Sequence, residues 1–147
     1  MSGELIYAFR VMRLPLLDAG GAQIGRLEDI VVIPGRAGRD ERQPIAPRVV
    51  GFVANSQRRR IFVNANRIAG LDSDGAQLRS WDVDLKPFKP HRGEILIGRD
   101  LIDSRIGDET VSDIALREHI GSRSSYWVID RVRLSRIAQD GLSHIRL

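Results

Sequence analysis

The sequence contains no cysteine, few aromatic residues and no long hydrophobic run. Without cysteine, neither a disulfide framework nor a thiolate metal site can form. Aromatic residues make up 5% of the chain and hydrophobic residues 42%, so Val, Ile and Leu must fill the core, and such residues favour strands. No segment approaches the ~18 consecutive apolar residues of a membrane-spanning helix. The first five residues have no basic start followed by an apolar run, which predicts no signal peptide.

Basic residues slightly outnumber acidic ones, and nearly all of them are arginine. The chain has 23 Lys and Arg against 19 Asp and Glu, a net charge of +4, and its only lysines are Lys86 and Lys89. The guanidinium fork suits bidentate recognition of phosphate, but a GC-rich coding sequence gives the same bias. Because acids are interleaved with the arginines, we interpret the charged surface mainly as a hydrated one.

A polar, glycine-bearing turn between two apolar segments occurs twice in the chain. Residues 14–30 recur as residues 98–114, with Asp18 aligned to Asp103, Asp29 aligned to Asp113, and one residue missing from the second turn. The turn and repeat residues are Asp18, Gly20, Gly21, Gly25 and Asp29 in the first copy and Asp103, Gly107 and Asp113 in the second. Each copy reads as a β-hairpin, so the repeat predicts two related β units.

The hydrophobic pattern predicts an all-β fold of short strands, typical of a small barrel. Strands are expected at residues 12–18, 24–33, 48–54, 60–63, 77–85, 101–106, 110–118 and 125–136, with a loop at 35–47, a helical turn at 64–68 and no regular structure at 86–93. We expect a first unit at 1–85, a connection at 86–97 and a second, partial unit at 98–147. Trp81 and Trp127 are expected to anchor the two cores.

The second unit is shorter than the first and cannot close an equal barrel by itself. It must take strands from the first unit, pair with another chain, or belong to a longer protein. An open sheet edge invites pairing, so we predict a homodimer or missing downstream domains.

Residues 17–32 resemble the opening hairpin of the PRC-barrel family, and residues 48–53 and 60–63 fit that family's central strands. Members of the family include the cytoplasmic domain of the photosynthetic reaction centre H subunit and the C-terminal domain of the ribosome maturation factor. The resemblance covers residues 11–85, with a partial second copy at 96–134, and implies a small PRC-type β-barrel followed by a partial PRC-like unit. The tandem arrangement is similar to the N-terminal region of actinobacterial MgtE-type magnesium-transporter-like proteins, in which helical and CBS domains follow.

Four aspartates are the only candidate metal ligands with a suggestive spacing. Asp72 and Asp74 lie in a turn, and Asp82 and Asp84 lie on one face of the expected strand that follows. Hard oxygen ligands suit magnesium, although solvent-facing acids and a plain turn explain the same pattern. The three histidines are far apart and no nucleophile motif occurs, so we expect no zinc site, no cofactor and no enzyme.

Arginines gather in two places that could contact a partner or phosphate. Arg58, Arg59 and Arg60 lie at or beside a hairpin tip, and Arg39 and Arg42 lie in the polar loop. Contact with RNA phosphates or anionic lipid is one interpretation, and a hydrated turn is the other.

Together these patterns favour a non-catalytic, cytoplasmic regulatory or docking module, associated with magnesium transport if the family resemblance holds. A protein partner, a second copy of the chain or downstream domains would add to the exposed sheet edge. An RNA or ribosomal-protein binding module is the alternative, and a component attached to the inner face of a membrane is the third class.

Overall fold

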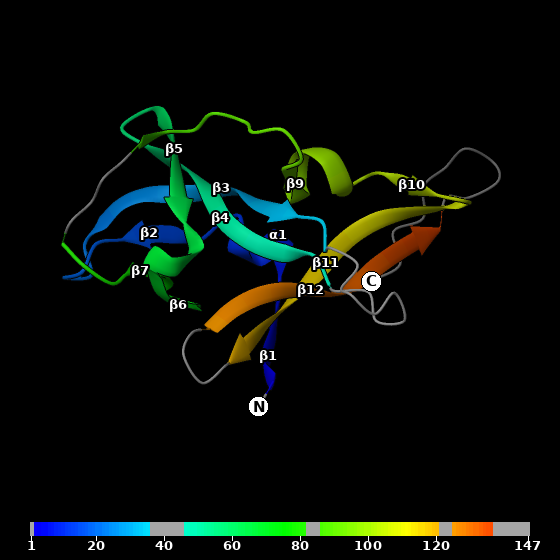
Figure 1. Ribbon diagram of the computed structural model, residues 1–147, viewed down its shortest axis with the longest axis horizontal. Coiled ribbons are helices and arrows are strands. Elements are labelled where there is room, and N and C mark those ends of the chain that lie inside the picture. Colours follow the sequence, from blue (N-terminus) through cyan, green and yellow to red (C-terminus); the bar gives the residue numbers. More distant parts are fainter. Residues whose placement is uncertain (1, 36–45, 82–85, 121–124, 137–147) are drawn as a thin grey trace.

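The computed structural model describes residues 2–35, 46–81, 86–120 and 125–136 and shows an all-β protein (Figure 1). The strands are β1 (Ser2–Tyr7), β2 (Pro15–Leu17), β3 (Gln23–Ile33), β4 (Arg48–Ser56), β5 (Arg59–Asn64), β6 (Ile68–Asp72), β7 (Gly75–Leu78), β8 (Lys86–Pro87), β9 (Ile95–Leu96), β10 (Arg105–Ile106), β11 (Glu109–Ile120) and β12 (Ser125–Arg136). The described helical turns are α1 (Ala8–Val11), η1 (Ala65–Arg67) and η2 (Ile97–Leu101).

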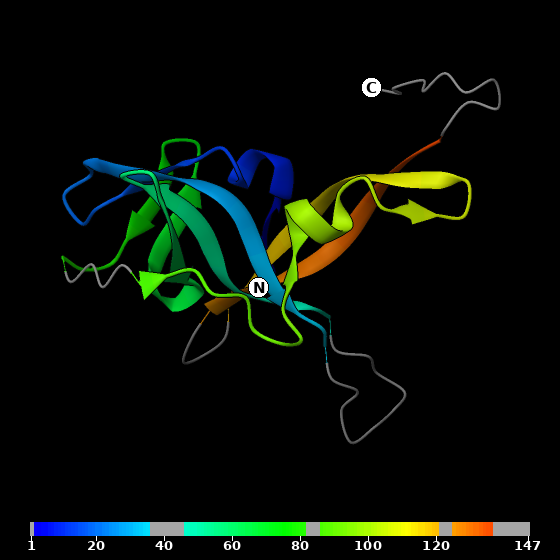
Figure 2. The ribbon, with the colours of Figure 1, turned by 90° about the horizontal axis from the view of Figure 1, so that it is seen from above.

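The strands form one curled sheet, like a half-closed barrel (Figure 2). Its main path runs β1-β11-β12-β4-β3-β2-β7-β6. Off this path, β5 pairs with β4 and β8, β9 pairs with β3, and β10 pairs with β11. The sheet therefore ends at β1 on one side and at β6 on the other.

Two halves of the chain have the same order of elements and the same irregularities. The first half is β1-α1-β2-β3-β4, and the second is β9-η2-β10-β11-β12. Glu28 of β3 and Val50 of β4 are extra residues at bulges in the β3–β4 pairing. Ser112 and Asp130 are the extra residues at the matching places in the β11–β12 pairing. Because bulges are specific local features of a strand pair, this agreement shows an internal structural repeat.

The two halves exchange their first strands. β1 pairs with β11, where Tyr7 lies opposite Ala115, and β9 pairs with β3, where Leu96 lies opposite Val31. The halves also meet directly, where Val128 of β12 pairs with Arg48 of β4. The second unit thus takes strands from the first, which is one of the three arrangements that its short length left open. Within the expected connection at 86–97, β8 and β9 pair with strands of the first half. The homodimer stays a prediction.

Two aspartates hold the ends of the exchanged strands β1 and β9 in place. The Asp29 carboxylate accepts hydrogen bonds from the Gly98 and Arg99 N–H groups, at 2.6 and 3.1 Å. The Asp113 carboxylate accepts one from the Phe9 N–H, at 3.0 Å. Each aspartate therefore caps the helical turn of the other half, since the first N–H groups of such a turn lack partners within it.

The interior is aliphatic and shared by both halves. Its fully buried side chains include Leu27, Ile30, Phe52, Ile114 and Leu116. Trp127 lies edge-on to Phe52, with ring centroids 6.1 Å apart. Trp81 is 72% exposed, so the prediction that it anchors a core is wrong. The strand expected at 77–85 ends at Leu78, before the alternating pattern reaches Trp81.

Three other local predictions are wrong. Of the strand expected at 12–18 only residues 15–17 form β2, and of the strand expected at 101–106 only residues 105–106 form β10, because Leu101 belongs to η2. Lys86 and Pro87, expected to be irregular, pair with β5. In each case a partner distant in sequence, such as β5 or the Asp29 cap, decides the local structure.

The alignment of Asp18 with Asp103 is also wrong, whereas that of Asp29 with Asp113 is confirmed by their matching caps. The Leu27 N–H bonds to the Leu14 carbonyl, and the Val111 N–H bonds to the Ser104 carbonyl, each at 2.9 Å. Ser104 thus corresponds to Leu14, and Asp103 precedes the hairpin. Five residues join β2 to β3, but only two join β10 to β11.

Candidate functional site

A groove lies between the two ends of the curled sheet. It has a volume of about 390 Å³ and is lined by Glu4, Leu5, Ile6, Arg10, Leu71, Asp72, Ser73, Glu118 and Trp127. These residues come from β1, α1, β6 and its following turn, β11 and β12. Among the described residues, β1 pairs only with β11 and β6 only with β7. Each of these strands therefore leaves one edge unpaired beside the groove.

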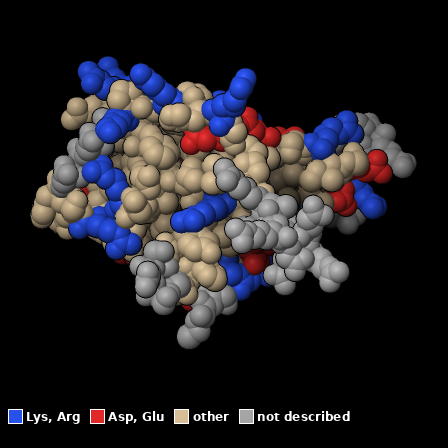
Figure 3. Space-filling model, viewed as in Figure 1, with Lys and Arg blue, Asp and Glu red and all other residues tan. Residues whose placement is uncertain are grey.

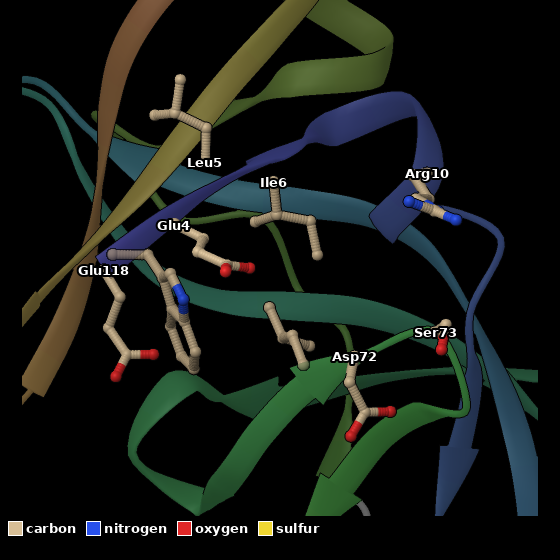
Figure 4. A pocket seen from close by; sticks show the side chains of 9 residues that line it. Glu4, Leu5, Ile6, Arg10, Asp72, Ser73 and Glu118 are labelled. Carbon is tan, nitrogen blue, oxygen red and sulfur yellow. The ribbon is translucent and has the colours of Figure 1, made fainter. Parts of the chain in front are cut away.

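Acidic side chains line the groove, with a single arginine. Figure 4 shows Glu4 and Glu118 at one end, Arg10 at the other and Asp72 below them. Glu4 and Glu118 form no ion pair with any described residue. Asp72 is already engaged, because its carboxylate accepts hydrogen bonds from the Asp74 and Gly75 N–H groups at 2.8 and 3.3 Å. The groove therefore carries uncompensated negative charge at the end nearer Glu4.

Glu118 takes its position from the pairing of the two longest strands. It lies directly opposite Trp127 in the β11–β12 ladder, and directly opposite residues point to the same face of a sheet. Trp127 is only 6% exposed and belongs to the core. The Glu118 carboxylate thus lies beside an apolar indole that faces the inside of the curl.

A groove with two unpaired edges and unpaired carboxylates can accept an extended segment of another protein. Unpaired N–H and C=O groups on an edge strand can continue the ladder with an added strand. Unpaired carboxylates favour a Lys or Arg side chain, because opposite charges attract and the cation donates hydrogen bonds to the carboxylate oxygens. The sequence pattern did not indicate this site, because its residues come from distant segments. The alternation in residues 125–136 gave no signal for it, because it groups Tyr126 with Val128 on the apolar face and leaves Trp127 on the other, whereas Trp127 is the buried residue.

The three arginines of the predicted contact site lie at one hairpin. The turn between β4 and β5 consists of Gln57 and Arg58, both at positive φ, 52° and 68°. This is the backbone conformation that a two-residue hairpin turn requires. Arg60 lies 3.4 Å from the Glu28 carboxylate. Contact of Arg58, Arg59 and Arg60 with RNA or anionic lipid stays a prediction, and Arg39 and Arg42 lie outside the described residues.

The candidate metal ligands are only partly described. Asp72 and Asp74 lie in the β6–β7 turn, where Asp72 caps backbone N–H groups. Asp82 and Asp84 lie outside the described residues. In the described ranges no three His, Asp or Glu side chains come together in a way that could hold a metal ion.

The predicted turn residues have structural roles. The Asp18 carboxylate accepts the Gly20 and Ala22 N–H groups, each at 2.9 Å, and Gly21 and Gly107 have positive φ, 89° and 63°. A Cβ at Gly25 would lie 2.5 Å from the Asn55 carbonyl oxygen, so this glycine permits β3 to approach β4 closely. Asp103 also has positive φ, 70°.

Two exposed aspartates outside the groove have lowered pKa values. Hydrogen bonds from Arg117 and Arg131 lower the pKa of Asp130, which lies at the β12 bulge. Hydrogen bonds from Arg99 and from the Leu96 N–H lower the pKa of Asp100 in η2. These ion pairs therefore lie at the bulge of β12 and at the η2 turn, where the regular strand pairing is interrupted.

Comparison with known proteins adds no relative for this chain. No family model, no curated protein and no solved structure matches it. No helix within the described part of the chain is long and apolar enough to cross a membrane.

Proposed function

We propose that this chain is a non-catalytic regulatory or docking module of the PRC-barrel type, whose partner adds an extended, basic segment to the groove between β1 and β6. The observation that supports this proposal is the open sheet, which ends at two unpaired edges facing one groove. An added strand would satisfy backbone groups of β1 or β6, and its cationic side chains would meet Glu4 and Glu118.

The experiment selects peptides from a displayed random library against the whole chain carrying Trp81→Phe. Trp127 is then the only tryptophan, and its emission reports events in the groove. We expect the selected peptides to be basic and to alter that emission. Because two carboxylates are lost, Glu4→Gln with Glu118→Gln should weaken their binding about tenfold or more.

The matched control is Asp108→Asn with Glu109→Gln, which removes the same charge at the β10–β11 turn, outside the groove. This pair should leave peptide binding unchanged apart from a small general effect of net charge. Peptides that bind without altering Trp127 emission, or that lose as much affinity to the control pair, would contradict the proposal.

From the family resemblance alone, we further propose that the partner is part of a magnesium-transporter-like protein. The test is the coding sequence beside this one. Helical and CBS segments there would support the proposal, and neighbours unrelated to metal transport would count against it.

A further inference from the structure

The outer face of β5 carries Phe62, which is half-buried against a small apolar cluster that includes Val53 and Leu96. Ile61 and Val63 are buried, at 3% exposure each, whereas Arg60, Phe62 and Asn64 point to the other face. The Phe62 ring lies against the β4 backbone, since a Cβ at Gly51 would be 2.4 Å from its Cζ atom. Gly51 thus permits the ring to lie close to the sheet.

Two hollows meet at Phe62 and Lys86. One, of about 320 Å³, is lined by Phe62, Lys86, Pro87, Lys89, His91 and Glu94. The other, of about 350 Å³, is lined by Phe62, Asn64, Asn66, Arg67 and Lys86. They follow one another across β5, from the η1 turn to the segment after β8. Their sizes are in the range of small-ligand sites, about 300–1,000 Å³.

Among the described residues that line these hollows, basic side chains outnumber acidic ones. Both lysines of the chain line the first hollow, and Arg67 lines the second. Glu94 is the single acidic residue among the described residues that line either hollow. Its Oε1 atom accepts a hydrogen bond from the His91 backbone N–H at 2.8 Å and lies 3.0 Å from the His91 ring Nδ1. Figure 3 shows Lys and Arg side chains spread over the half of the molecule that contains β5.

We propose that this surface, the Phe62 groove, binds a nucleotide, either free or as a unit of single-stranded RNA. The apolar lining from Phe62 and Pro87 suits a planar base, which stacks on aromatic rings regardless of its identity. Lys86 and Lys89 on the same hollow suit the phosphate that a nucleotide carries next to its base. Neither a bare anion nor an apolar ring alone uses both parts of the lining.

This surface is separate from the acidic groove between β1 and β6, and it is also separate from the hairpin tip. Arg58 and Arg59 do not line either hollow. The Phe62 groove further supplies an aromatic platform, which the arginines at the tip lack. Binding here would therefore neither require nor exclude a protein partner in the acidic groove.

The experiment measures binding of fluorescein-labelled oligouridylate RNA to the whole chain by fluorescence anisotropy, with UMP and inorganic pyrophosphate as competitors. Lys86→Gln with Lys89→Gln should weaken RNA binding about tenfold or more, and should reduce the slope of log K against log salt by about 1.4, since each phosphate contact to a single strand contributes about 0.7. Phe62→Leu keeps an apolar side chain over Gly51 and should weaken binding about tenfold, because stacking is lost.

The control removes the same charge at the hairpin tip, through Arg58→Gln with Arg59→Gln, and should change RNA binding less than about threefold. Competition by UMP but not by pyrophosphate supports the inference and indicates free nucleotides as ligands. If longer RNA competes and UMP does not, the inference is supported and the ligand is RNA. Equal competition by pyrophosphate, a larger loss in the control pair, or no RNA or UMP binding would overturn it. Circular dichroism melts verify that each variant is folded.

Discussion

Asp29 and Asp113 each close a helical turn that belongs to the other half of the chain. Each carboxylate also accepts the N–H of the residue that follows it, Ile30 at 2.7 Å and Ile114 at 2.8 Å. Each aspartate side chain therefore connects the bulge of its own strand to the helical turn that follows the first strand of the other half. The Asp-Ile dipeptide that ends both copies of the repeat is visible in the sequence. Its capping role is not, because the capped N–H groups belong to residues far away in the chain.

At this scale we predict that Asp29→Ala lowers the free energy of unfolding by about 1–2 kcal/mol, because capped N–H groups lose their partner. Asp113→Ala should cost less, since Asp113 caps one N–H group of the opposite turn and Asp29 caps two. Urea unfolding checks both values. Asp108→Ala, at an exposed turn, is the control and should change stability by less than about 0.5 kcal/mol. Equal effects of all three variants would contradict the capping roles.

Among the elements, those set by local sequence were predictable, and those that depend on a distant partner were not. β12 has the bounds expected from its sequence, residues 125–136, and the η1 turn falls within the expected 64–68. By contrast, the strand expected at 101–106 begins only at Arg105, and Leu101 is the last residue of η2. The difference arises because the η2 N–H groups are capped by Asp29, 69 and 70 residues away. A local pattern contains no information about such a partner.

A prediction at the scale of elements concerns two glycines in strands. Gly51→Ala should destabilise the protein by about 1–3 kcal/mol, because its Cβ would collide with the Phe62 ring at 2.4 Å and the Val63 carbonyl oxygen at 2.6 Å. Gly70→Ala has open space and no positive φ, so it should raise stability by about 0.4–1 kcal/mol. Thermal unfolding of the two variants checks the contrast. A Gly51 variant as stable as the original chain would show that β4 and β5 are farther apart.

For the molecule as a whole, the sequence predicted an all-β fold with an internal repeat, and both are confirmed. It left open whether the second unit takes strands from the first, because pairing between distant strands depends on tertiary packing. The candidate site was predicted only as an exposed sheet edge. Glu4, Leu71 and Trp127 meet there because the sheet curls, so that its β1 end with the nearby β12 faces its β6 end. No spacing within the chain indicates that meeting.

The central claim is that the ends of the sheet, β1 and β6, remain open and accept an extended basic segment. Backbone amide exchange, measured by NMR on the whole chain with and without a peptide selected for binding, tests it most directly. We predict that amides of β1 or β6 that have no strand partner exchange fast in the free chain and become protected when the peptide binds. Protection confined to β12 or the β4–β5 hairpin, or slow exchange along both edges in the free chain, would contradict the claim.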